Sequence, residues 1–279
     1  MARKRWGEPT KDYAVEAALG NIPGVTCINK FGETLDADAG AANNTDAWDG
    51  ADGVTSTKLW VMPTQARVHA IVSTSDVDSA AGGVVAEGNG AHTVRVYGLK
   101  DWDTAETNED ITLDGTTSVN TSDSYVIIHR MEILTYGSDL AQTGIITATA
   151  ATDGTVTAAI QPHEGDGQGQ TQMAIYGVPS TQTLLVTHLE GGTEGSVGIL
   201  ARLMVKLNAD LSTSGFNNKH SFKFTDTSSG SVQISTAYHR TFEIPRVFAG
   251  PCIVKIEVQS DTNNSPAHAA FDGFLVTTS

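Results

Sequence analysis

The chain has 279 residues, of which 39% are hydrophobic and 18% are charged, and its net charge is −15. This length is enough for one large domain or two smaller domains with buried cores. Seventeen basic residues against 32 acidic ones would repel a phosphate backbone, so the composition argues against a nucleic-acid partner.

The N-terminus opens with a basic cluster, Arg3 to Arg5, but charged residues recur in the segment that follows it. No apolar stretch of a secretory signal is present there. The longest apolar runs fall short of the ~20 residues that a membrane helix requires. We therefore expect neither a signal peptide nor a membrane partner, and synthesis in the cytoplasm.

Residues 1–57 differ in pattern from the rest of the chain. Thr10 is a candidate cap for a short helix over Lys11–Leu19, which Gly20 would end. The acidic stretch Glu33–Gly53 then shows no sustained hydrophobic period. We expect an extended N-terminal arm that becomes ordered against a neighbouring subunit, with a disordered leader as the alternative.

Residues 58–163 show the alternation of short strands and form a predicted first β-sandwich unit. Asp153-Gly154 between two apolar segments predicts a hairpin. The apolar run Ser124–Tyr136 predicts either a strand covered on both faces or one broken by a bulge. The predicted strands are Arg67–Thr74, His92–Leu99, Asp110–Leu113, Ser124–Tyr136, Gly144–Ala150 and Thr155–Ile160.

Residues 164–279 form a predicted second β-sandwich unit, separated from the first by the glycine-rich loop Glu164–Gln170. Many short strands with almost no helix predict an all-β fold, an antiparallel β-sandwich of jelly-roll-like type. The alternative to two units is one compact domain. The predicted strands are Met173–Val178, Thr183–Leu189, Val197–Leu207, Ser221–Phe224, Ser231–Ser235, Ile253–Val258 and Gly273–Thr277.

No motif predicts a catalytic residue, a cofactor site or a metal site. The eight histidines are scattered without a metal-binding spacing, and Cys27 and Cys252 match neither a disulfide framework nor a zinc motif. Acidic pairs such as Asp36/Asp38 and Asp101/Asp103 are expected to be solvated, with a weak calcium site as the alternative. We therefore expect a protein that is not an enzyme.

Several segments resemble virion structural proteins of marine and freshwater tailed bacteriophages, a family without an assigned function. The resemblance covers most of the chain, but it consists of strands and turns rather than a catalytic signature. The sequence departs from the family after Pro179, where a glycine-containing loop is usual. The segments that carry the resemblance are Gly20–Gly24, Pro63–Ser75, His92–Leu99, Ile111–Val119, Ser124–Met131, Gly144–Val156 and Gln172–Pro179.

The resemblance implies a particle-associated protein, assembled in the host cytoplasm. We expect a capsid decoration or cement subunit, a homotrimer that also contacts the major capsid protein. The alternatives are a tail, neck or fibre component, and a glycan-binding adhesin with Trp60 or Trp102 in an exposed groove. The residues expected at a subunit interface are Trp6, Tyr13, Ile22, Phe31 and Trp48.

Overall fold

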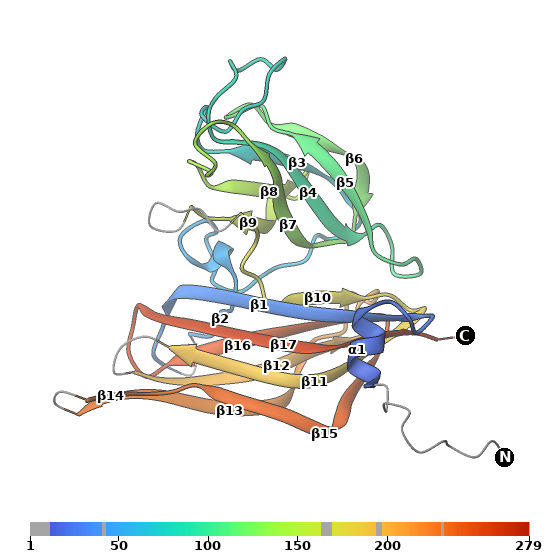
Figure 1. The fold of residues 1–279 in the computed structure, drawn as a ribbon, viewed down its shortest axis with the longest axis vertical. Coiled ribbons are helices and arrows are strands. Elements are labelled where there is room, and N and C mark those ends of the chain that lie inside the picture. Colours follow the sequence, from blue (N-terminus) through green and yellow to red (C-terminus); the bar gives the residue numbers. More distant parts are fainter. Residues whose placement is uncertain (1–11, 41–42, 163–168, 194–196, 230–231, 279) are drawn as a thin grey trace, which may run out of the picture.

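The computed structural model describes residues 12–40, 43–162, 169–193, 197–229 and 232–278. The chain forms two stacked lobes, an upper one built from β3 to β9 and a lower one built from β1, β2 and β10 to β17 (Figure 1). Every paired strand in both lobes is antiparallel to its neighbours. The predicted all-β, antiparallel fold is confirmed.

The lower lobe is a sandwich of two sheets. One sheet has the order β1 (Val25–Ala37), β17 (Ser265–Thr277), β11 (Gln182–Thr193) and β15 (Tyr238–Ala249). The other has the order β10 (Ile175–Val178), β16 (Cys252–Ser260), β12 (Gly198–Leu207), β13 (Phe216–Ser229) and β14 (Val232–Thr236), with β2 (Thr45–Asp46) paired to β16.

The strand order of the lower lobe is that of a jelly roll. When β1, β10, β11, β12, β13, β15, β16 and β17 are counted one to eight, the first sheet reads one-eight-three-six and the second reads two-seven-four-five. This interleaving is the pattern that two Greek keys give when they close into a double sheet. The jelly-roll-like prediction therefore holds for the lower lobe.

The predicted N-terminal arm is wrong over most of its length. β1 pairs with β17 from Val25 to Ala37, and β2 pairs with β16, so both belong to the sheets of the lower lobe. The helix is present as α1 (Tyr13–Ala18), but its cap is Asp12, whose carboxylate accepts from the N–H of Ala14 at 2.9 Å. Thr10 and Trp6 lie outside the described residues.

The upper lobe is a second, smaller sandwich, inserted between β2 and β10. Its sheets have the orders β6-β3-β8-β9 and β5-β4-β7, and the short helix η1 (Asp49–Ala51) precedes them. The strands are β3 (Arg67–Ser73), β4 (Ala91–Leu99), β5 (Thr107–Thr112), β6 (Val119–Tyr125), β7 (Ile127–Tyr136), β8 (Ile146–Ala150) and β9 (Thr155–Ile160).

The upper lobe contains the predicted hairpin and the long apolar run. β8 and β9 form the hairpin expected at Asp153-Gly154, and Gly154 has the positive φ, 66°, that such a turn favours. The long apolar run divides at Val126, where the chain passes from one sheet to the other. Ile127 to His129 are all buried because β7 is covered by its own lobe on one face and contacts β10 of the lower lobe on the other.

The two connections between the lobes pair with each other. Trp48 and Met173 form an antiparallel bridge, and the N–H of Ala174 donates to the carbonyl of Ala47 at 2.9 Å. The hydrophobic core of the upper lobe also includes Ile175 and Ile253, which belong to strands of the lower lobe. The lobes are therefore joined by both hydrogen bonds and apolar packing.

Candidate functional site

The residues predicted for a subunit interface occupy different environments. Tyr13 is 52% exposed on α1, and Ile22 and Phe31 are half-buried in the turn before β1 and in β1 itself. Trp48 is 1% exposed in the core of the upper lobe, so its assignment to an interface is wrong. The bulky ring packs against the chain's own Gly50, which the sequence pattern around it did not reveal.

The outer face of the sheet β1-β17-β11-β15 carries a row of apolar side chains. The strand register places Cys27 beside Phe274, Phe274 beside Leu185, and Leu185 beside Val247. Alternation along each strand puts these four side chains on the face opposite the core residues Leu184, Phe271 and Leu275. We call Cys27, Phe274, Leu185 and Val247 the apolar row.

An outer sheet face in a sandwich is normally polar, because it faces water. The apolar row instead crosses the whole sheet, from the edge strand β1 to the edge strand β15. Of the elements that the structure describes, α1 covers one end of it, where Tyr13 packs edge-on against Phe274 with ring centroids 5.4 Å apart. The other end remains open, with Val247 62% exposed.

The two ends of the apolar row present further apolar side chains. On α1, Val15 is 53% exposed and Leu19, at the C-cap, is 67% exposed. On β15, Ile244 is 83% exposed in a segment of extra residues between the paired positions Thr241 and Arg246. Sequence reasoning missed Leu185 and Val247, because their common face depends on the strand register.

The groove between the lobes contains a buried polar cluster beside a cavity. The cavity has a volume of about 490 Å³, and its lining includes Lys30 of β1, Glu106, His129 of β7 and Tyr176 of β10. The ammonium of Lys30 donates to the backbone carbonyl of His129 at 2.5 Å, and His129 Nε2 lies 2.5 Å from the Glu106 carboxylate. The rings of His129 and Tyr176 pack with centroids 4.4 Å apart.

Burial sets the protonation of this cluster. It lowers the pKa of Lys30 from its ordinary value to about 7, although the nearby Glu106 opposes the shift. It also lowers the pKa of His129, so the imidazole is neutral at neutral pH. The neutral ring then donates from Nε2 to Glu106 and accepts at Nδ1 from the N–H of Gly177, 3.4 Å away.

Each of these groups has a partner inside the chain. The hydroxyl of Tyr176 also hydrogen-bonds Glu106, and burial raises the pKa of Tyr176 well above its ordinary value. A lysine with a pKa near 7 is a feature of some catalytic sites. Here its donor is directed at a backbone carbonyl, across the boundary between β1 and β7. The arrangement therefore fastens the two lobes together.

The acidic pairs singled out in the sequence form local contacts. Asp36 and Asp38 both pair with the ammonium of Lys58, at 2.8 and 2.7 Å. Asp101 accepts from the N–H groups of Asp103 and Thr104, which closes a turn. The carboxylates are thus engaged with neighbouring protein groups.

The tryptophans suggested for a glycan groove do not form one. Trp60 is 4% exposed, and its indole N–H donates to the carbonyl of Thr157 at 2.9 Å, so its predicted exposure is wrong. Trp102 is half-buried against the core of the upper lobe. Cys252 is a buried apolar residue, and burial raises the pKa of its thiol to about 12.

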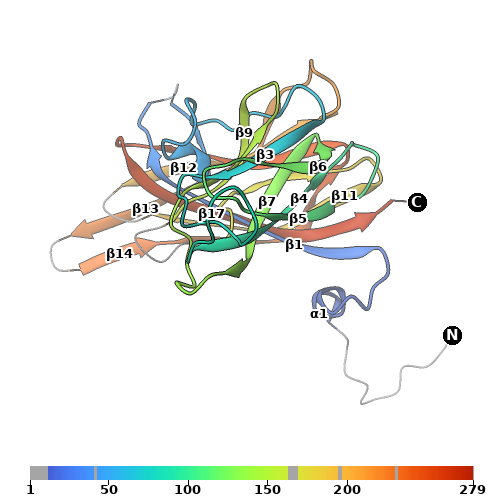
Figure 2. The same ribbon diagram turned by 90° about the horizontal axis from the view of Figure 1, so that it is seen from above.

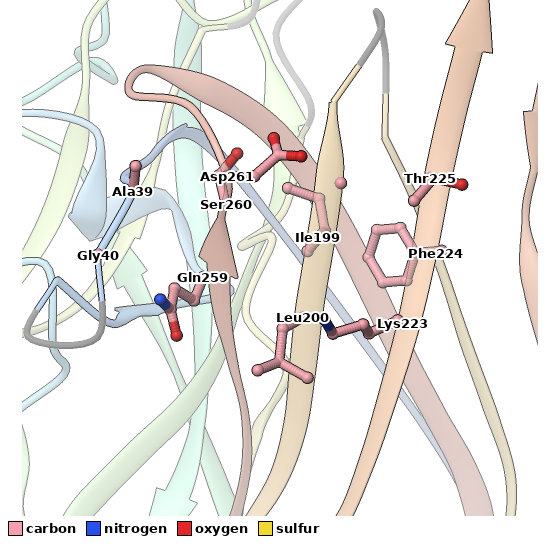
Figure 3. Close-up of a pocket in the computed structure, with 11 residues that line it drawn as sticks. Ala39, Gly40, Ile199, Leu200, Lys223, Phe224, Thr225, Gln259, Ser260 and Asp261 are labelled. Carbon is pink, nitrogen blue, oxygen red and sulfur yellow. The ribbon is translucent and has the colours of Figure 1, made fainter.

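A second cavity, of about 350 Å³, lies over β12 near the end of the lower lobe. Ala39 and Gly40 flank it on one side and Phe224 and Thr225 on the other (Figure 3). Lys223 of β13 and Asp261, directly after β16, contribute single charges from different segments. They do not converge on a common point as the groups of a specific ligand site would.

No family model and no curated protein matches the chain. A solved structure of infectious bursal disease virus, Gt strain, aligns with 90% of this chain and 70% of that chain, at 10% sequence identity and a TM-score of 0.14. A TM-score this low carries no argument, so the fold assignment depends on the strand order. Among the described residues, no helix has the length and apolar character needed to cross a bilayer.

Proposed function

We propose that the chain is a structural protein of a tailed-phage virion, a decoration or cement subunit that stabilises the shell through contacts between subunits. It acts as a homotrimer that also contacts the major capsid protein, and it has no catalytic role. Jelly rolls occur in viral capsid proteins, but also in lectins and cupins, so the fold alone does not decide the function.

The apolar row is the observation that supports this proposal most strongly. An apolar sheet face that the described part of the chain covers at one end and leaves exposed at the other is typical of a surface that meets another subunit. A second copy of the chain is the partner that best fits it. Arg240 and Arg246 of β15 lie over the ring of the core residue Phe242, so the contact on this face rests on its apolar side chains.

Contacts between the α1 end of one subunit and the β15 end of the next join two different surfaces. Repetition of such a head-to-tail contact closes a ring when the rotation between subunits allows it, and three copies give the proposed trimer. A stable interface buries about 1,200–2,000 Å² in total. A tail, neck or fibre component would use the same kind of contact and would differ in the number of copies per particle.

Light scattering on the purified full chain tests the contact. We expect a trimer for the wild type and a monomer for Val247→Glu, because the substitution buries a charge among the apolar side chains at the β15 end of the contact. Val84→Glu is the matched control, since Val84 is 85% exposed in the upper lobe, away from the apolar row. A wild-type monomer, or a Val247→Glu variant that remains trimeric, would contradict the proposal.

A further inference from the structure

A cluster of two imidazoles and a carboxylate lies on the outer face of the sheet β1-β17-β11-β15, beyond the apolar row. His188 and Glu190 belong to β11, and His239 belongs to β15. The register pairs Glu190 directly with His239 and pairs His188 with Thr241. One ligand atom from each of the three residues lies within 4.8 Å of the other two.

The distances between the candidate ligand atoms are close to those between ligand atoms on a bound metal ion. The Oε2 atom of Glu190 lies 3.8 Å from His188 Nε2 and 3.5 Å from His239 Nδ1. A tetrahedral zinc ion with bonds of about 2.0–2.1 Å holds its ligand atoms about 3.4 Å apart. Small side-chain rotations are therefore enough to form the three bonds.

The backbone and a neighbouring hydroxyl hold the ligands in place. A register shift between Val186 and His188 places His188 on the outer face, opposite the core residues Val186 and Leu189. Its Nδ1 atom lies 3.2 Å from the hydroxyl of Thr241, which leaves Nε2 directed toward Glu190. Metal-bound histidines are commonly oriented by such a hydrogen bond from the other ring nitrogen.

We propose that His188, Glu190 and His239 bind a divalent transition-metal ion of the zinc class. Two imidazoles and one carboxylate suit zinc and its neighbours in the transition series rather than calcium, which prefers oxygen ligands. The side chain of His239 is 62% exposed, so the fourth position is open to water. The site was missed in the sequence because strand pairing, rather than spacing along the chain, brings its histidines together.

Calorimetric titration with zinc chloride, after treatment of the full chain with EDTA, tests the proposal. We expect one ion per chain, and an affinity at least about tenfold weaker in His239→Ala and in Glu190→Gln. His268→Ala is the control, because His268 is an exposed imidazole that stands over Gly192, two positions beyond Glu190 on the same face. Its titration should equal that of the wild type.

Several results would overturn this site. They are a wild type that gives no heat of binding, a His239→Ala variant that titrates like the wild type, and a His268→Ala variant that loses as much affinity as His239→Ala. The visible absorption of bound cobalt provides a second readout, since its intensity reports tetrahedral coordination. We expect the band in the wild type and in His268→Ala, and its loss in folded Glu190→Gln.

Discussion

Lys30 links the two lobes by a hydrogen bond, and its protonation depends on its burial. Its side chain belongs to a strand of the lower lobe, and its ammonium reaches the backbone of β7 in the upper lobe. A buried ammonium is costly unless it is paired, and burial lowers its pKa to about 7. The protonation of Lys30 is thus coupled to folding.

We expect the free energy of unfolding to rise with pH because of Lys30. Between pH 7 and about 10.5, the unfolded chain keeps the proton that the folded chain releases, so raising the pH favours the folded state. From pH 7 to pH 9, the wild type should gain about 2 kcal/mol relative to Lys30→Met. Urea unfolding at both pH values measures this difference.

Lys100→Met is the control for this experiment. Lys100 forms a surface ion pair with Asp123, at 2.6 Å, and the side chains are 41% and 42% exposed. Surface pairs of this kind contribute little to stability. The variant should therefore keep the pH dependence of the wild type. Equal pH dependence in wild type and Lys30→Met would show that Lys30 is not held as described.

At the scale of elements, the junction depends on β1 passing close to both connections between the lobes. A Cβ atom on Gly32 would lie 2.0 Å from the carbonyl oxygen of Ala47 and 2.4 Å from the nitrogen of Ala174. Both are backbone atoms of the paired connections and have little freedom to move. Only glycine fits at this position.

Gly32→Ala should therefore destabilise the protein by about 1–3 kcal/mol, since it overpacks a site enclosed by backbone. Gly215→Ala is the matched control, because a Cβ atom there meets nothing within 4 Å. Its effect should stay within about 0.5 kcal/mol. The midpoint of urea unfolding reports both changes, and equal midpoints for the two variants would refute the described junction.

Elements with a local signal, such as alternation or turn chemistry, could be predicted from the sequence. Elements whose pairing joins distant parts of the chain could not. Clean alternation identified β4 and β16, and turn chemistry identified the β8–β9 hairpin. β1 was mistaken for part of an arm, because an edge strand next to a second lobe buries residues such as Lys30 and Thr34 in place of a regular apolar series. Its pairing with β17 joins opposite ends of the chain, which no local pattern records.

The same limit applied to the candidate surfaces. Tyr13 and Phe31 are individually conspicuous as aromatic residues in a polar segment, and both lie partly exposed in the structure. The apolar row could not be predicted, because its members come from four strands whose order follows from the jelly roll. Trp48 was misplaced, since a lone tryptophan in an acidic segment gives no sign of the lobe that encloses it.

At the scale of the whole molecule, the upper lobe stands over the edges of the two lower sheets, near β1 and β10, while the face with α1 remains at the side (Figures 1 and 2). This arrangement leaves the apolar row free of the upper lobe. A ring of subunits joined through that face would present its upper lobes on one side. Such a shape suits a protein that caps the surface of a shell.

Counting the copies of the chain in purified virions tests the central claim most directly. Quantitative mass spectrometry against the major capsid protein gives this number without assuming where the chain is bound. A decoration or cement subunit predicts hundreds of copies per particle. Absence of the chain from the particle, or only a handful of copies, would contradict that role.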